Sequence, residues 1–165
     1  MIKFVQGDIL KASVDALVNP VNCIGIMGKG LAHQFQKAFP HNYDLYSLAC
    51  WKQEVQTGKM FITHNPEPTG PRLIVNFPTK RHWRRPSQLC WIVDGLQDLR
   101  NVIIGQSVDS IAIPPLGCGN GGLDWSAVWP EIVLALNDLE TVDIRIYGTV
   151  LEVTACMMYR TPKLV

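Results

Sequence analysis

The sequence NPVNCIGIMGKGL at residues 19–31 joins an apolar run to three glycines within six positions, and it contains no acidic side chain. A second glycine-rich stretch, PPLGCGNGGLDW, occupies residues 114–125. Each stretch follows a strand-like run and precedes a helix-like pattern. In α/β sheets, ligands bind where such loops meet, at the carboxyl ends of the strands. The two stretches therefore predict one ligand site between two glycine loops.

The rest of the chain alternates between strand-like and helix-like patterns. Apolar runs predict strands at residues 2–6, 16–22, 59–65, 72–78, 110–116 and 142–148. Helical spacing predicts helices over residues 30–51, interrupted at Pro40, and over 86–104, with Pro86 in the first turn. Asp124 is a candidate cap for a last helix, and Pro130 predicts that this helix begins only near Trp129. This order predicts an α/β domain with a mixed, largely buried sheet between helices.

Composition indicates a single globular domain, which we expect at residues 1–155, followed by a C-terminal tail at residues 156–165. Hydrophobic residues make up 47% of the 165 positions, and the net charge of +1 indicates no particular partner. The five cysteines are an odd number and form no Cys-x-x-Cys pair, which favours a reduced protein without a zinc site. Residues 1–8 lack the basic region and apolar run typical of a signal peptide, and no apolar run approaches the length that spans a membrane. We therefore expect a cytoplasmic protein with no membrane partner.

The chemistry of the glycine loops indicates a diphosphate ligand. Glycine lets the backbone approach a ligand closely, so that several amides can converge on one anion, and helix N-termini add favourable dipoles. A P-loop is excluded, because Cys23 and Gly30 stand where that motif needs glycine and a hydroxyl residue. The Rossmann glycine pattern is absent from the first loop as well. The alternative is that these glycines serve only in turns.

Several short motifs in the right order resemble the macrodomain family, whose members share a three-layer α/β/α fold with a central mixed sheet and bind ADP-ribose. The motifs are GDI at 7–9, VNPVN at 18–22, GKGLA at 28–32, the second glycine stretch, and IYG at 146–148. The stretches GIMGKGLA and NFPTK are most similar to the ADP-ribosyl glycohydrolase branch and, within it, to the DarG antitoxins. That resemblance implies an enzyme that removes ADP-ribose from thymidine bases of single-stranded DNA without a cofactor. It also implies a partner, the toxin DarT, contacted mainly through a further C-terminal domain.

The resemblance assigns an ADP-ribose-binding role to residues in both loops and at three strand ends. Asp8 and the Ile9 backbone would bind adenine, Tyr147 would pack against it, and Asn22 and Thr79 would hold the distal ribose. The remaining candidates are Pro20, Val21, Gly28, Lys29, Gly30, Leu31, Gly117, Cys118, Gly119, Asn120 and Gly121. Asp8 could instead be a turn or cap residue, and Tyr147 a core aromatic.

Lys80 and Asn22 are the candidate catalytic residues. Lys80 follows a strand at the end where the glycine loops are expected, and in the related glycohydrolases the matching lysine attacks the distal ribose. An amine can attack only when unprotonated, so we expect a depressed pKa. Gly121 stands where the related protein glycohydrolase has an aspartate, which leaves open whether Lys80 acts covalently or by electrostatics or proton transfer. A solvated surface lysine is the plain alternative.

The stretch KRHWRRP at residues 80–86 favours a nucleic-acid substrate. Positive side chains follow phosphates, and an exposed aromatic ring can stack on a base. The candidate DNA-binding residues are Arg81, His82, Trp83, Arg84 and Arg85. A solvated loop with one packed tryptophan is the alternative. Two other functions stay open: hydrolysis of ADP-ribosyl-glutamate on proteins, and binding of ADP-ribose without turnover.

Candidate nucleophiles other than Lys80 are not expected. Cys23 and Cys118 lie in the glycine loops, but no histidine is adjacent in sequence to activate either, so both are interpreted as small packing residues. His33 follows the first loop and is interpreted as a packing or surface residue. No metal site is predicted.

Overall fold

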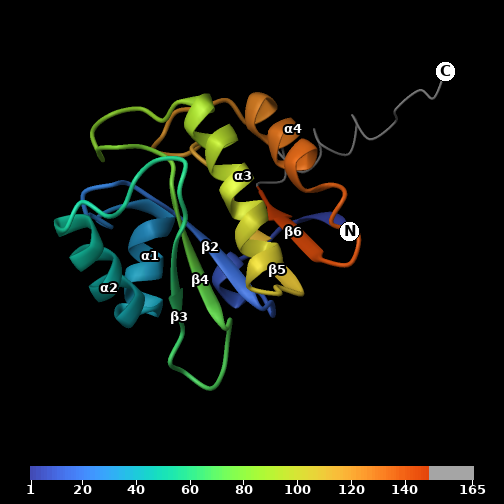
Figure 1. The fold of residues 1–165 in the computed structure, drawn as a ribbon. Helices are drawn as coiled ribbons and strands as arrows, with labels where there is room; N and C mark the ends of the chain where they lie inside the picture. Colours follow the sequence, from blue (N-terminus) through green and yellow to red (C-terminus); the bar gives the residue numbers. More distant parts are fainter. Residues whose placement is uncertain (149–165) are drawn as a thin grey trace.

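The computed structural model describes residues 1–148 (Figure 1). The predicted tail at 156–165 and the last seven positions of the predicted domain lie outside the described residues. The strands are β1 (Ile2–Val5), β2 (Ala16–Val21), β3 (Phe61–His64), β4 (Leu73–Pro78), β5 (Ser110–Ile113) and β6 (Asp143–Tyr147). The helices are α1 (Gly30–Ala38), α2 (Pro40–Trp51), α3 (Leu89–Gly105) and α4 (Trp125–Leu136), with a short 3₁₀ helix at Ile9–Lys11.

The six strands of residues 1–148 form one mixed sheet in the order β1-β6-β5-β2-β4-β3. In this sheet the β3–β4 pair is antiparallel, and the other four pairs are parallel. Helices occupy both sides of the sheet (Figure 1). The predicted three-layer α/β/α fold with a mixed sheet is confirmed. Since five strands run the same way, their carboxyl ends lie at one edge of the sheet, which is where ligands bind in such folds.

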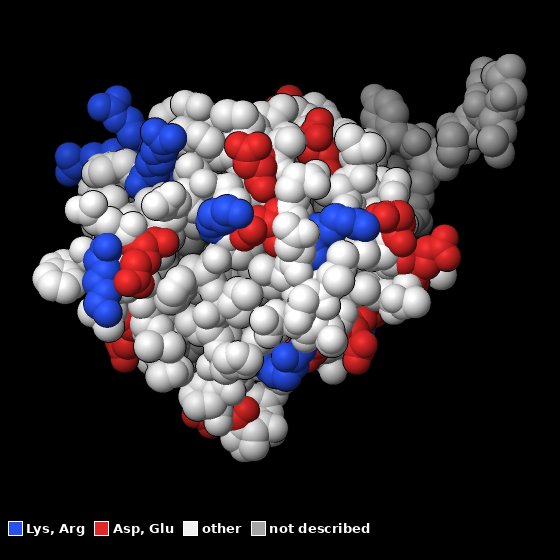
Figure 2. Space-filling view, in the orientation of Figure 1, with Lys and Arg blue, Asp and Glu red and all other residues white. Residues whose placement is uncertain are grey.

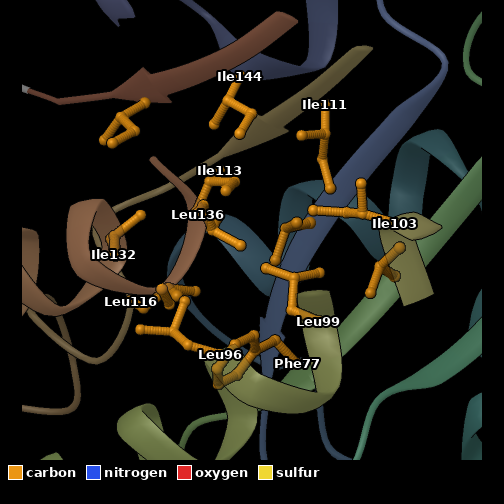
Figure 3. Close-up of a cluster of buried hydrophobic side chains, with 14 of the residues drawn as sticks. Phe77, Leu96, Leu99, Ile103, Ile111, Ile113, Leu116, Ile132, Leu136 and Ile144 are labelled. Carbon is orange, nitrogen blue, oxygen red and sulfur yellow. The ribbon is translucent and has the colours of Figure 1, made fainter. Parts of the chain in front are cut away.

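The side chains of β2 alternate between the two faces of the sheet, and different helices cover each face. Ala16 and Val18 belong to the larger core cluster, which contains side chains of α3 and α4 (Figure 3). Leu17 belongs to a second cluster on the opposite face, with Phe35 of α1. Successive residues of a strand point to opposite faces, so β2 is buried on both. Burial on both faces explains why the sequence of β2 is almost entirely apolar.

Two predicted helix starts are wrong, and tertiary contacts explain both. The helix predicted from Pro86 begins at Leu89, because the Ser87 amide donates to the Gly121 carbonyl at 2.9 Å and holds the chain against the second glycine loop. The helix predicted to begin near Trp129 begins at Trp125. Asp124 caps it by accepting from the Ser126 amide, as predicted, and the buried Trp125 anchors the first turn despite the proline within the helix. The predicted break at Pro40 is confirmed.

A buried amide network supports the ends of β2 and β4. Asn19 donates to the Asn76 side chain at 3.0 Å across the paired strands. Asn76 donates in turn to Asn42 of α2 at 2.7 Å, and the Thr63 hydroxyl donates to the same Asn42 oxygen. Asn19 also contacts the sulfur of Met27, at 3.7 Å. Buried polar groups of this kind fix one arrangement because an unpaired partner is costly. The network thereby joins the first glycine loop to the strand that precedes Lys80.

Within residues 1–148, no helix combines the length and the apolar character needed to cross a membrane.

Candidate functional site

A cleft of about 1070 Å³ lies at the carboxyl edge of the sheet. Each of the five parallel strands, or the loop that follows it, contributes to its walls. The lining residues are Gly7, Ile9, Pro20, Val21, Asn22, Ile26, Gly28, Lys29, Gly30, Leu31, Ala32, Thr79, Lys80, Trp83, Arg84, Pro114, Pro115, Gly117, Cys118, Gly119, Asn120, Gly121, Tyr147 and Gly148. Every predicted ADP-ribose-binding residue except Asp8 is among them. The fold thus brings the two glycine loops together, although about 85 residues separate them along the chain.

The first glycine loop is organised by the side chain of Asn22. Its Oδ1 accepts from the amide of Ile24 at 3.0 Å, and its Nδ2 donates to the carbonyl of Ile26 at 2.6 Å. The Tyr46 hydroxyl donates to the Asn22 carbonyl at 2.7 Å and fixes the same residue from α2. Asn22 lines the cleft, but its amide already serves the loop. Its contact with a ribose and its catalytic role stay predictions, and the structure adds a role in holding the loop.

The second glycine loop tolerates a side chain at one position and excludes it at another. A Cβ on Gly121 would lie 2.3 Å from the Gly117 carbonyl oxygen and 2.3 Å from Ser87 Oγ. A Cβ on Gly119 would meet no atom within 4 Å. The packing therefore explains why Gly121 carries no aspartate, since no side chain fits there unless the loop moves. Gly119 faces open space at the cleft.

The two glycine loops approach each other at Gly30 and Asn120. Gly30 begins α1 with φ +61°, and a Cβ placed on it would lie 2.9 Å from Asn120 Nδ2. Glycine is favoured here because the backbone is left-handed, and a side chain would also displace the end of the Asn120 side chain. The amino-terminal end of α1 consequently opens into the cleft beside the second loop, an arrangement that favours an anionic ligand.

Lys80 lies buried at the junction of the second glycine loop and the segment after β4. Its relative exposure is 8%. Its Nζ donates to the Asn120 carbonyl at 2.8 Å and to the Trp83 carbonyl at 3.2 Å. Burial lowers the pKa of the Lys80 ammonium below its ordinary value, as predicted for a reacting amine. The alternative of a solvated surface lysine is excluded by this burial.

No aspartate or glutamate of residues 1–148 lines the cleft. The position that could have supplied one, Gly121, has no room for a side chain. Lys80 is therefore the buried ionisable group best placed to transfer a proton or attack a carbon at this end of the cleft. In the same part of the chain, no group of three or more His, Cys, Asp and Glu side chains is placed to hold a metal ion.

The opposite end of the cleft is formed by the ends of β1 and β6. Ile9, Tyr147 and Gly148 line it, and Tyr147 is buried. The carboxylate of Asp8 does not line the cleft: it caps the 3₁₀ helix by accepting from the Leu10 amide at 3.1 Å. Capping was the alternative for this residue, and its contact with adenine stays a prediction. Tyr147 lines the cleft but also belongs to the second core cluster, which was the alternative for this residue, and its packing against adenine stays a prediction.

The basic segment, residues 80–85, extends from the cleft over the surface. Figure 2 shows Lys and Arg side chains gathered over the loop between β4 and α3. Of its five candidate DNA-binding residues, Trp83 and Arg84 line the cleft, whereas Arg81, His82 and Arg85 lie outside it. The Arg84 guanidinium lies 4.5 Å from the centroid of the Trp83 ring, and Arg81 lies over Trp91. The three arginines are exposed and have no acidic partner within the described chain.

Cys23, Cys118 and His33, which were interpreted as packing or surface residues, each contact a backbone carbonyl near the cleft. Burial raises the pKa of the Cys23 thiol, which makes it a weak nucleophile, and its sulfur contacts the Lys80 carbonyl oxygen. Cys118 lines the cleft and contacts the Leu116 carbonyl through its sulfur. The His33 ring contacts the carbonyl of Met27 and supports the first loop from α1.

Sequence reasoning missed several lining residues, of which Ile26 is chemically the most informative. The others are Gly7, Ala32, Pro114, Pro115 and Gly148. From the sequence, Ile26 is assigned only to the first glycine loop. A large apolar side chain between Gly25 and Gly28 nevertheless indicates a residue that faces outward from the loop. Such a side chain has little room to pack beneath a tight loop, so it faces either solvent or a ligand.

A mixed sheet whose five parallel strands end at two converging glycine loops is typical of nucleotide-binding α/β domains. Residues 18–132 match the Macro domain family, and the chain belongs to that family. The solved macrodomain of Mycobacterium tuberculosis DarG superimposes with a TM-score of 0.89 at 49% identity, covering 90% of this chain and 98% of that one. The macrodomain of Thermus aquaticus DarG superimposes with a TM-score of 0.86 at 49% identity, covering 90% and 99%.

Curated relatives carry a specific enzyme name. The Mycobacterium tuberculosis relative named DNA ADP-ribosyl glycohydrolase is 50% identical over 147 residues, which are 89% of this chain and 42% of that protein. A Thermosipho africanus relative, named as a fusion of a DNA ADP-ribosyl transferase and a DNA ADP-ribosyl glycohydrolase, is 34% identical over 161 residues, covering 88% and 41%. This chain thus spans less than half the length of these two relatives.

Proposed function

We propose that this protein is a DNA ADP-ribosyl glycohydrolase that releases ADP-ribose from thymidine bases of single-stranded DNA. The observation that carries the proposal is the environment of Lys80. This buried amine joins the second glycine loop to a basic, aromatic segment at the cleft. The enzyme name of the relatives supports the same reaction.

The cleft suits the two parts of an ADP-ribosylated base differently. The glycine loops offer backbone amides and a helix N-terminus to the diphosphate, and the wall at Tyr147 offers an apolar surface to adenine. These groups bind the ligand without reacting with it. Lys80 lies where the basic segment begins, so the bond to be broken is proposed to lie beside its Nζ.

Lys80 can promote the cleavage in two ways. As a neutral amine, it would attack the ribose carbon while the electron pair of the broken bond leaves on thymine, which would take up the proton that the amine loses. Water would later attack the same carbon and break its bond to the Lys80 nitrogen, so that ADP-ribose and the amine are released. As an ammonium, it would give a proton to the departing thymine while water attacks the ribose carbon, and the proton that the water loses would return to the Lys80 amine. Neither route needs a carboxylate at Gly121. Both make the amine essential.

The proposal is tested by comparing three measurements on the wild-type protein. Under single-turnover conditions, we expect release of ADP-ribose from a single-stranded oligonucleotide modified on thymidine, and far slower release from a protein modified on glutamate. Calorimetric titration with free ADP-ribose should show binding. Release only from the protein substrate would favour the protein hydrolase, and binding without release from either would favour a non-catalytic module.

Arg84 and Arg85 should act on the DNA strand and not on free ADP-ribose. Both are exposed, and positive side chains that contact phosphates make binding salt-dependent. Replacing both by alanine should reduce the salt dependence of binding to modified oligonucleotide by about 0.7 log units for each phosphate that the arginines neutralise. Affinity for free ADP-ribose should stay within about threefold, because the diphosphate is assigned to the glycine loops. Coincident slopes for variant and wild type would show that these arginines do not touch the DNA backbone.

The proposed partner is a DNA ADP-ribosyl transferase, DarT, whose modification this protein would reverse as an antitoxin. A relative named as a fusion of the two enzymes supports this pairing, as does the likeness of this chain to Thermosipho africanus DarTG in complex with ADP-ribose. The substrate of the proposed reaction is cellular DNA, which implies a cytoplasmic location.

A further inference from the structure

Two exposed apolar side chains line the cleft at the end where Lys80 lies. Nine large hydrophobic side chains are exposed within residues 1–148, and only Ile26 and Trp83 of these nine belong to the cleft. Ile26 is 43% exposed and Trp83 is 39% exposed. Apolar surface left open inside a ligand cleft indicates an apolar part of the ligand.

Backbone hydrogen bonds hold the loops that carry these two residues side by side. The Thr79 amide donates to the Val21 carbonyl at 2.9 Å, and the Cys23 amide donates to the Arg81 carbonyl at 3.2 Å. The first glycine loop and the basic segment therefore leave the sheet as neighbours. Lys80 lies between Thr79 and Arg81, the two residues of this segment that make these hydrogen bonds. Its Nζ donates to the carbonyl of Trp83.

The ring of Trp83 is oriented before any substrate arrives. The His82 ring stacks on it, with 5.8 Å between centroids and 20° between planes, and the Arg84 guanidinium lies 4.5 Å from its centroid. His82 Nδ1 accepts from the Arg84 amide at 3.1 Å, which fixes the imidazole in turn. An aromatic ring held in this way loses little conformational entropy on binding. The 39% of Trp83 that stays exposed is open to contact with a ligand.

We propose that Ile26 and Trp83 form the binding site for the nucleobase that leaves, with Ile26 in contact with the 5-methyl group of thymine. This inference rests on the proposed function, which places a base beside Lys80 and ADP-ribose in the rest of the cleft. An apolar side chain against the methyl group is a means by which proteins distinguish thymine, and aromatic rings hold bases with little sequence preference. Trp83 therefore contributes affinity for any base, and Ile26 distinguishes thymine from a base without the methyl group.

The test combines two substrates with two variants under single-turnover conditions. The substrates are identical oligonucleotides that carry ADP-ribose on thymidine or, at the same ring atom, on deoxyuridine. Burial of one methyl group predicts that the wild type favours thymidine about fourfold. In Ile26→Ala this preference should fall to about one. Trp83→Ala should slow release from both substrates about tenfold, as removal of an aromatic ring that stacks on a base does, and should leave the preference unchanged.

Ile24→Ala is the matched control for the loop. Ile24 is 41% exposed in the same loop but does not line the cleft, so this variant should retain the wild-type rates and the wild-type preference. The affinity of all variants for free ADP-ribose should stay within about threefold, because the base is not part of that ligand. The base site is overturned if Ile26→Ala keeps the thymidine preference, if Trp83→Ala matches the wild type, or if Ile24→Ala behaves as Ile26→Ala does. Failure of the wild type to act on either oligonucleotide would instead overturn the proposed function and the base site with it.

Discussion

Replacing Lys80 by alanine is expected to slow release of ADP-ribose from modified DNA by about 10³-fold or more, while binding of free ADP-ribose changes little. The amine is the group assigned to the chemical step, and removal of a nucleophile or a proton donor typically costs orders of magnitude in rate. Binding should survive because most of the contacts to the ligand are assigned to the glycine loops and Tyr147, which line the rest of the cleft. Single-turnover release and calorimetric titration measure the two effects separately.

Lys37→Ala is the matched control for this variant. It makes the same chemical change on the exposed side of α1, away from the cleft lining. Its rate should equal that of the wild type, and circular dichroism should show both variants folded. Turnover by Lys80→Ala at a rate close to the wild type would remove Lys80 from the chemistry and with it the observation on which the proposed function rests.

The pH dependence of the reaction separates the two possible roles of Lys80. Burial lowers the pKa of this ammonium, so its neutral form is populated at a lower pH than that of an exposed lysine. If the neutral amine attacks the ribose, the rate should rise as the pH approaches the pKa of Lys80 from below. If the ammonium protonates the departing base, the rate should fall over the same range. A covalent adduct isolated after acid quenching would accompany the first result only.

The sequence predicted the fold because its signals are local. A buried strand such as β2 is apolar throughout, and a helix such as α3 shows its apolar face at regular spacing. The glycine loops were also predictable, since glycine is used where a backbone turns or approaches a ligand. The carboxyl ends of the five parallel strands lie together, and this brings most of the predicted residues into one cleft, although Asp8, Arg81, His82 and Arg85 lie outside it.

The features that sequence reasoning missed depend on contacts between distant segments. The amide of Asn22 is used by its own loop and by Tyr46, which follows only from the packing of α2. The absence of an aspartate at Gly121 looked like a missing catalytic group, whereas the structure gives it a steric cause in Ser87 and Gly117. Both helix starts that were placed wrongly also depend on such contacts. The periodicity of the sequence gives no sign of these contacts.

Gly119→Glu is expected to abolish binding of ADP-ribose while the protein stays folded. Gly119 lines the cleft within the second glycine loop, and a new carboxylate there would fill the space for the diphosphate and repel its charge. The fold should tolerate the change, because a Cβ at this position meets no atom within 4 Å and φ of Gly119 is not in the left-handed region. Calorimetric titration with ADP-ribose, beside circular dichroism and thermal unfolding, measures both expectations.

Gly105→Glu is the matched control for the added charge. Gly105 ends α3 on the exposed surface, and a Cβ there also meets no atom within 4 Å. This variant should bind ADP-ribose with the wild-type affinity, so that a loss of binding seen only in Gly119→Glu reports the position of the charge and not its presence. Gly121→Asp differs from Gly119→Glu in that the new side chain has no space. Steric conflict with the Gly117 carbonyl predicts that this variant disturbs the loop itself. Unchanged affinity in a folded Gly119→Glu protein would show that the second glycine loop does not face the diphosphate, and the ligand would then have to be reassigned within the cleft.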